Sequence, residues 1–86
     1  MSVGAVKATL QEGNMSLDQA KVTVEGIGAA LAEVETLVLH TLHDSNHSDA
    51  DATRSTLADA TREVRLLLRT IYAAQQHATT CLKSLG

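Results

Sequence analysis

The sequence predicts an all-α fold, an antiparallel two-helix hairpin that pairs with a further hairpin into a four-helix bundle. In each half of the chain, apolar or small residues recur at alternating intervals of three and four, as in helices that pack along one stripe. A short polar segment separates the two halves. The predicted stripe of the first half is Val3, Val6, Leu10, Gly13, Leu17, Ala20, Val24, Ile27, Leu31, Val34 and Val38. That of the second half is Ala50, Thr53, Leu57, Ala60, Val64, Leu67, Ile71, Ala74, Ala78, Cys81 and Leu85.

The first helix is expected over residues 3–42, beginning between Ser2 and Val6. Gly13 is an unfavourable helix-interior residue, by about 1 kcal/mol relative to Ala. The heptad crosses this point in phase, so one continuous helix is predicted, and a short helix before a break is the alternative. Gly26 and Gly28 lie in the middle of the helix, where small residues indicate a close helix contact or a local bend.

The connector is expected at residues 43–47, a normal length for a helical hairpin. The second helix then covers residues 48–84. Ser48 is the predicted N-cap, because its hydroxyl can accept from a free backbone N–H, and Asp51 follows three residues later in the position of a reciprocal cap. Residues 1–86 are thus expected to form a single helical-hairpin domain.

A register follows if residues whose numbers sum to 91 face each other, because every layer then joins two stripe positions. Ile27 would face Val64, for example, and Val34 would face Leu57. Three interhelix ion pairs are expected in this register: Glu33–Arg62, Glu25–Arg65 and Glu35–Arg54. Such exposed pairs contribute roughly 0–1 kcal/mol each but can select a partner and an orientation.

Leucine, valine and methionine side chains outside the stripe indicate a further interface. A lone hairpin buries one stripe of each helix and is usually marginal in stability. The expected interaction residues are Met15, Val22, Leu39, Leu42, Leu66, Leu68 and Leu82. A homodimer or higher homo-oligomer is the simplest closed solution, and another helical protein is the alternative partner.

Composition argues against several functional classes. The net charge is −3, and Tyr72 is the only aromatic residue apart from the histidines, so nucleic-acid binding is not expected. Arg62, Arg65 and Arg69 lie on one side of the second helix and could contact a phosphate or an acidic partner, although they are more simply a solvated face. No stretch is long and apolar enough to span a membrane, and no signal-peptide pattern is present, so a cytoplasmic location is expected.

The turn carries the only cluster of candidate metal ligands. His40, His43 and His47 lie close in sequence to Asp44 and Asp49, and imidazole and carboxylate groups are zinc ligands. Histidine is also favoured near a helix C-terminus, where its protonated form meets the negative end of the dipole. No metal or other cofactor is therefore expected, and a metal- or pH-responsive regulator is an alternative function.

Catalytic patterns are absent from the sequence. Cys81 is expected to be a small buried hydrophobic residue of the stripe. His77 lies four residues before it, but no acid or oxyanion site accompanies the pair. A bare hairpin also lacks a concave pocket that could exclude water from a reaction. The chain is expected not to be an enzyme.

The length and hairpin layout resemble the small Trp-x-Gly proteins of the type VII secretion system. This resemblance implies an antiparallel four-helix dimer and, as an alternative function, a secretion-related hairpin protein or partner. The motifs of that family are missing, since the turn reads His43-Asp44-Ser45-Asn46-His47 and Tyr72 is followed four residues later by Gln76 rather than by an acid. Secretion is therefore not implied.

The Ala-, Val- and Thr-rich, Lys-poor composition is similar to that of small actinobacterial hairpin proteins of unknown function. The function expected from the residues themselves is a non-catalytic protein–protein interaction module that acts through apolar helix faces.

Overall fold

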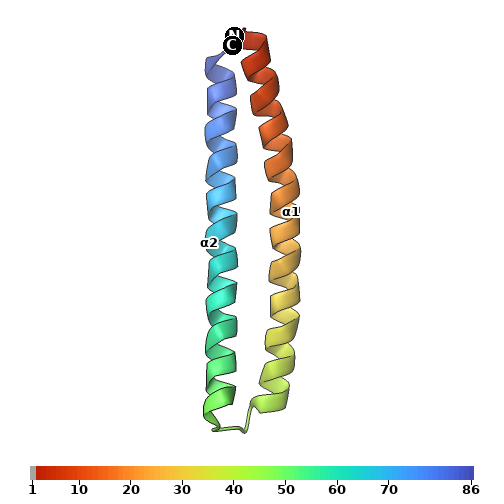
Figure 1. Cartoon of the computed structure of the whole chain (residues 1–86), viewed down its shortest axis with the longest axis vertical. Helices are drawn as coiled ribbons and strands as arrows, with labels where there is room; N and C mark the ends of the chain where they lie inside the picture. Colours follow the sequence, from red (N-terminus) through yellow and green to blue (C-terminus); the bar gives the residue numbers. More distant parts are fainter. Residues whose placement is uncertain (1) are drawn as a thin grey trace.

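The protein is a hairpin of two long antiparallel helices. The structure, a computed structural model, describes residues 2–86 and contains α1 (Val3–Leu42) and α2 (Ser48–Ser84). The helices lie side by side, with the two termini together at one end and the turn at the other (Figure 1). The Cα atoms extend over 62 × 16 × 15 Å, so the molecule is a rod. The predicted all-α hairpin is confirmed, and the helix bounds agree with those predicted.

Side chains cap both helix starts. The Ser2 hydroxyl accepts from the Ala5 N–H at 3.1 Å, and α1 then continues through Gly13 without a break, as predicted. The predicted cap of α2 is wrong by one residue. His47 is the N-cap, because its backbone is still extended (ψ 141°) and its Nδ1 accepts from the Asp49 N–H at 3.1 Å. Ser48 is already the first helical residue.

Arg54 closes the turn from the first turns of α2. Its guanidinium donates to the carbonyl of Leu42 at 3.1 Å and to that of Ser45 at 3.4 Å, and it pairs with Asp51. The last carbonyls of a helix have no partner within the helix. The Leu42 carbonyl also accepts from the Ser45 N–H at 2.9 Å, so Arg54 is its second donor, and Arg54 is the donor to the Ser45 carbonyl. The side chain therefore ties the end of α1 to the start of α2.

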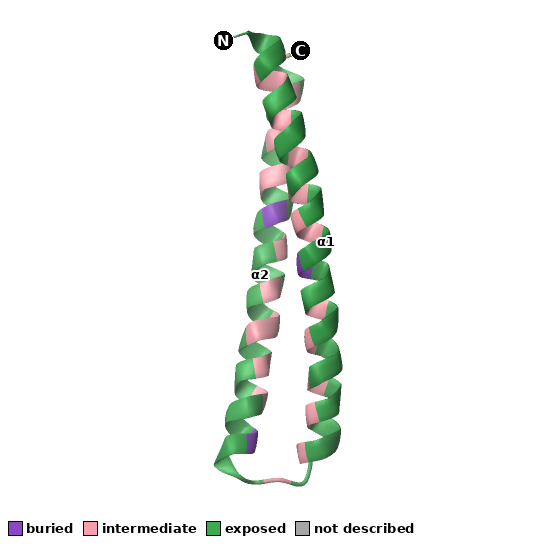
Figure 2. Cartoon of the chain, turned by 45° about the vertical axis from the view of Figure 1, so that its right-hand side comes forward, coloured by how far each residue is buried: buried purple, intermediate pink, exposed green. Residues whose placement is uncertain are grey.

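The interhelix seam, meaning the positions of each helix that face the other helix, is only partly shielded. Within residues 2–86, Val24, Ala50 and Ile71 are the only buried residues, and most of the seam is half-buried (Figure 2). Two helices form one contact and leave its two edges open to water. The hairpin thus has a line of contact rather than a closed core.

Half of the predicted stripe faces the other helix, and the other half lies at one edge of the contact, where its small members Ala20, Ala60 and Ala74 and also Val6 are half-buried and the rest are exposed. The confirmed half is Leu10, Leu17, Val24, Leu31 and Val38 in α1, and Ala50, Leu57, Val64, Ile71, Ala78 and Leu85 in α2. The second half of the seam lies one residue later than predicted. It consists of Lys7, Asn14, Lys21, Gly28, Glu35 and Leu42 in α1, and Arg54, Thr61, Leu68, Gln75 and Leu82 in α2. Both helices are therefore rotated in the same sense relative to the prediction.

The register differs from the predicted one by one or two residues. Asp18 contacts Gln75, and a Cβ at Gly28 would lie 3.3 Å from Cγ1 of Val64, so the facing numbers sum to 92 or 93 rather than 91. The close approach expected in the glycine-rich part of α1 is found at Gly28, whereas Gly26 has open space. A glycine at 28 lets the α2 side chain reach the α1 backbone, which draws Gly28 into the seam in place of Ile27.

The three predicted interhelix ion pairs do not form among the described residues. Arg54 and Arg62 instead pair with Asp51 and Asp59, each three residues earlier on the same helix. Glu35 accepts a hydrogen bond from the Thr61 hydroxyl across the seam. A partner three residues away on one helix requires less ordering of long side chains than a partner on another helix, so the local pairs form.

Candidate interaction surface

An uncharged surface lies along one edge of the seam. It contains the half of the predicted stripe that the helix rotation moved out of the contact, and we call it the front flank. The front flank is Val6, Gly13, Ala20, Ile27, Val34 and Thr41 of α1 with Thr53, Ala60, Leu67, Ala74 and Cys81 of α2. None of these residues carries a charge. Three large members keep much of their surface in water: Ile27 is 49%, Val34 42% and Leu67 48% exposed.

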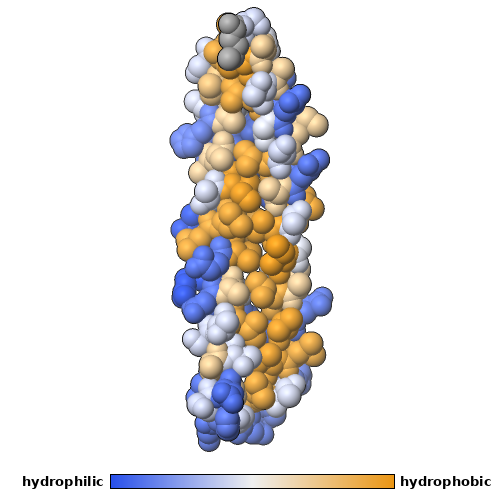
Figure 3. Space-filling view, in the orientation of Figure 1, coloured by the Kyte–Doolittle hydropathy of each residue, from blue (hydrophilic) through white to orange (hydrophobic). Residues whose placement is uncertain are grey.

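The contributions of the two helices lie on the same side of the molecule. Val34 of α1 and Thr53 of α2 line one shallow groove together with Val38 and Leu57 of the seam. In an antiparallel helix pair, positions that directly precede the same type of seam position flank the same edge. The space-filling view shows a continuous apolar band that crosses both helices, broadest in the half nearer the turn (Figure 3). The hairpin therefore has a long apolar side.

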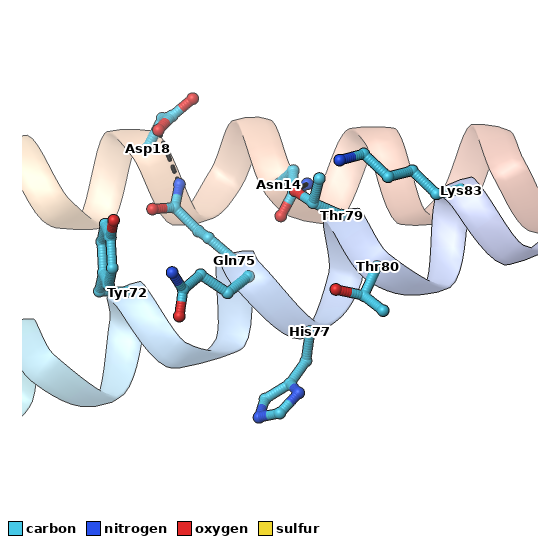
Figure 4. A pocket seen from close by; sticks show the side chains of 9 residues that line it. Asn14, Asp18, Tyr72, Gln75, His77, Thr79, Thr80 and Lys83 are labelled. Atoms are coloured by element: carbon cyan, nitrogen blue, oxygen red, sulfur yellow. Dashed lines mark hydrogen bonds between the residues drawn. The ribbon is translucent and has the colours of Figure 1, made fainter.

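The opposite edge of the seam has Leu39 and Ala58 near the turn, whereas it is polar in the half nearer the termini. There Gln75 donates to the Asp18 carboxylate at 2.7 Å, and Asn14 donates to the Thr79 hydroxyl at 3.5 Å (Figure 4). These groups line a groove of about 680 Å³ that Tyr72 borders. The Asn14 Oδ1 is buried without a hydrogen-bond partner. Polar contacts of this kind set the register of paired helices at some cost in stability.

The seven predicted interaction residues divide into two groups. Those that project into solvent are Met15 (65% exposed), Val22 (67%), Leu39 and Leu66. Leu42, Leu68 and Leu82 are half-buried along the seam, where they replace predicted stripe residues, so they already pack within the hairpin. Sequence reasoning missed Ile27, Val34 and Leu67 because it assigned them to the hairpin contact. The available signal was the width of the apolar pattern, since apolar residues beside both seam lines are typical of helices that contact more than one neighbour.

The turn histidines do not converge. The His43 ring contacts the carbonyl of His40 at 3.0 Å and the Asp44 carboxylate at 3.0 Å, while His47 caps α2. Across residues 2–86, no group of three or more His, Cys, Asp or Glu side chains is placed to hold a metal ion. The helix cap uses Nδ1 of His47, so a metal at that nitrogen would have to compete with the cap.

The arginines and the cysteine also have defined places. Arg62 pairs with Asp59 on its own helix, and Arg62, Arg65 and Arg69 are all exposed. Cys81 is exposed as well, so the expectation that it is buried is wrong. The reason is again the rotation of α2, which brings Leu82 into the seam instead.

None of the helices described over residues 2–86 combines the length and apolar character needed to cross a lipid bilayer. Comparison with known proteins finds no matching family model, no significantly similar curated protein and no significantly similar solved structure. The similarity to the type VII secretion hairpins therefore stays a prediction from the sequence, and the front flank is the feature of this chain on which a functional hypothesis rests.

Proposed function

We propose that the protein is a non-catalytic helical interaction module that binds an apolar helical surface through its front flank. The observation that carries the proposal is the lack of charge along this flank on both helices, combined with three large side chains that are each more than two-fifths exposed. An uncharged band of this length is unusual on a monomeric protein and is typical of an interface.

Energetics support the same conclusion. Removing apolar surface from water contributes about 25 cal/mol per Å². Within the hairpin this contribution is small, because Val24 and Ile71 are the only large side chains that are buried among the described residues. A helical partner on the front flank would cover Ile27, Val34 and Leu67 and would close one open edge of the seam. The partner is a second copy of the chain or another helical protein.

The test compares two single charge substitutions in the full chain. Leu67→Glu places a carboxylate in the middle of the front flank, whereas Val22→Glu places one at an equally apolar and even more exposed position outside it. We expect Leu67→Glu to weaken association at least about tenfold, because its charge would be buried without a partner. Val22→Glu serves as the matched control and should associate as the wild type does.

Sedimentation equilibrium or light scattering over a range of concentrations measures self-association against the 9.1 kDa mass of one chain. Circular dichroism on all three proteins checks that the helices remain formed. If the wild type is monomeric, the wild type and both variants are each immobilised. The amount of a helical partner protein that each of them retains is then compared. If Leu67→Glu weakens neither self-association nor binding to another chain, the proposal is refuted.

A further inference from the structure

We infer that the occupant of the front flank is a second copy of this chain, packed flank to flank with its turn at the opposite end. This inference rests on the proposed function and adds the identity of the partner and its orientation. Four helices then enclose the two front flanks, and the polar edges of both hairpins, with the groove at Asp18 and Gln75, face outward. Area, charge and shape each support this arrangement.

The exposed area of the hairpin exceeds that of a compact protein of its mass. The chain exposes 6305 Å². A folded monomer of 9.1 kDa is expected to expose about 4,900 Å², so the excess is about 1,400 Å². A stable dimer of standard size buries about 800 Å² on each partner. One side of a rod 62 Å long and 16 Å wide is large enough to bury that area against a second copy.

Charge favours a partner whose surface is itself uncharged. The front flank has no charged residue. The corresponding outer line of α2 carries Asp49 and Glu63, whereas the neighbouring outer line of α1 has no charge. That outer line is Thr9, Ser16, Thr23, Ala30 and Leu37. A charged partner surface would lose hydration here without gaining an ion pair. The front flank of a second copy meets this requirement, since it has the same uncharged residues.

Shape selects the orientation. Along α1 the side chains of the front flank are small towards the termini, at Gly13 and Ala20, and large towards the turn, at Ile27 and Val34. When two copies run in opposite directions with α1 on α1, Ile27 packs against Ala20 of the second copy, and Val34 packs against its Gly13. Each large residue then meets a small one, which lets facing side chains fill the space between the helices.

The same two-fold axis gives large-to-small packing on α2. If α2 lies on α2, Leu67 packs against Ala74 of the second copy. The midpoint between positions 20 and 27 of α1 and the midpoint between positions 67 and 74 of α2 lie at nearly the same height. The interhelix contacts Asp18–Gln75 and Gly28–Val64 bracket this height on either side. One axis therefore satisfies both helices.

The other flank-to-flank orientation has both turns at the same end and places α1 on α2 of the second copy. In the register of the hairpin, Ile27 would then face Leu67, and Ala20 would face Ala74. Val34 would still face Ala60, but at the two central levels a large residue would meet a large one and a small residue a small one, which combines overpacking at one level with a void at the next. Opposed turns avoid both.

Cys81 provides a direct test, because it is the only cysteine and lies exposed in the front flank. When the turns are opposed, the two-fold axis pairs position 67 with position 74 of the second copy. The same axis brings Cys81 next to position 60 of the second copy. Turns at the same end bring it next to position 13. A disulfide needs Cα atoms within about 7 Å of each other, so each introduced thiol reports one orientation. The two variants are Ala60→Cys and Gly13→Cys.

We expect mild oxidation to convert Ala60→Cys into a covalent dimer on a non-reducing gel, while Gly13→Cys gives none. The wild type should also give none, since opposed turns separate the two Cys81 residues by about 30 Å along the helices. A bond within one hairpin is distinguished because the mass stays that of one chain. Both sites tolerate the change, as a Cβ at Gly13 meets no atom within 4 Å and Ala60 is only half-buried. Circular dichroism confirms the fold of both variants.

A covalent dimer from Gly13→Cys but not from Ala60→Cys would overturn the orientation, and so would equal cross-linking of both or of neither in a protein that is dimeric by mass. A monomeric wild type without cross-linking in either variant would overturn the second copy as the occupant. The proposed function would still stand in that case if retention of another helical protein depended on Leu67. The two failures are therefore distinguishable.

Discussion

Replacing Gly26 and Gly28 by alanine, one at a time, isolates the contribution of the close helix approach to stability. The two residues lie two positions apart in the same helix, so the gain in helix propensity is nearly the same, about 1 kcal/mol for each. Their surroundings differ. A Cβ at Gly26 meets no atom within 4 Å, whereas a Cβ at Gly28 lies 3.3 Å from Cγ1 of Val64. The difference between the two variants therefore measures the contact with α2.

The expected magnitudes follow from this geometry. Gly26→Ala should raise the free energy of unfolding by about 1 kcal/mol, which corresponds to roughly 4–8 °C in Tm for a domain of this size. At position 28 the new methyl group is closer than the 3.5–4.0 Å or so at which carbon atoms pack. Val64 is β-branched and has one preferred χ1 in a helix, so its side chain has little freedom to give the few tenths of an ångström that the new methyl group needs. Overpacking of this kind costs about 1–3 kcal/mol, and Gly28→Ala should lower stability by about 1 kcal/mol in total.

The assay is urea unfolding followed by circular dichroism at one fixed protein concentration, since the stability of an oligomer depends on concentration. Val64→Ala, alone and combined with Gly28→Ala, completes a double-mutant cycle. The coupling between positions 28 and 64 should be at least about 0.5 kcal/mol, with Val64→Ala relieving the cost of the methyl group. If Gly28→Ala stabilises the protein as much as Gly26→Ala does, the close packing of α1 on α2 at this level is refuted.

Five further substitutions at four positions test the turn and the polar edge of the seam, each by the same unfolding assay. His47→Ala should cost about 1 kcal/mol through loss of the N-cap, whereas Ser48→Ala should cost little, and the reverse order would identify Ser48 as the cap. Arg54→Ala should cost about 1 kcal/mol, because the Ser45 carbonyl loses its donor while the Leu42 carbonyl keeps the Ser45 N–H. Arg54→Lys should recover only part of this, since an ammonium lacks the planar fork, and full recovery would show that charge alone suffices. Asn14→Leu should gain about 1–2 kcal/mol by removing a buried oxygen without a partner, and a loss would indicate that the Thr79 contact outweighs it.

The sequence determined the helices themselves. Heptad spacing, a polar segment of turn length and the absence of a phase break at Gly13 were sufficient to place α1 and α2 at their observed bounds. These features are local, since they depend on residues within one or two turns of the same helix. The half of the seam that the prediction and the structure have in common, around Val24 and Ile71, was predictable for the same reason.

One line of seam residues, which includes Val24 and Leu31, is common to the prediction and the structure. Only the tertiary structure decided which residues beside this line complete the seam. Ile27 and Gly28 lie on either side of this line, and a pattern with both small and large residues beside one line is compatible with two rotations of the helix. The choice depends on contacts between the helices. Gly28 allows Val64 to approach closely, and Arg54 fixes the end of α1 against the start of α2. Hydropathy does not record how closely two backbones can approach, and this approach is what left Ile27, Val34 and Leu67 exposed together on the front flank.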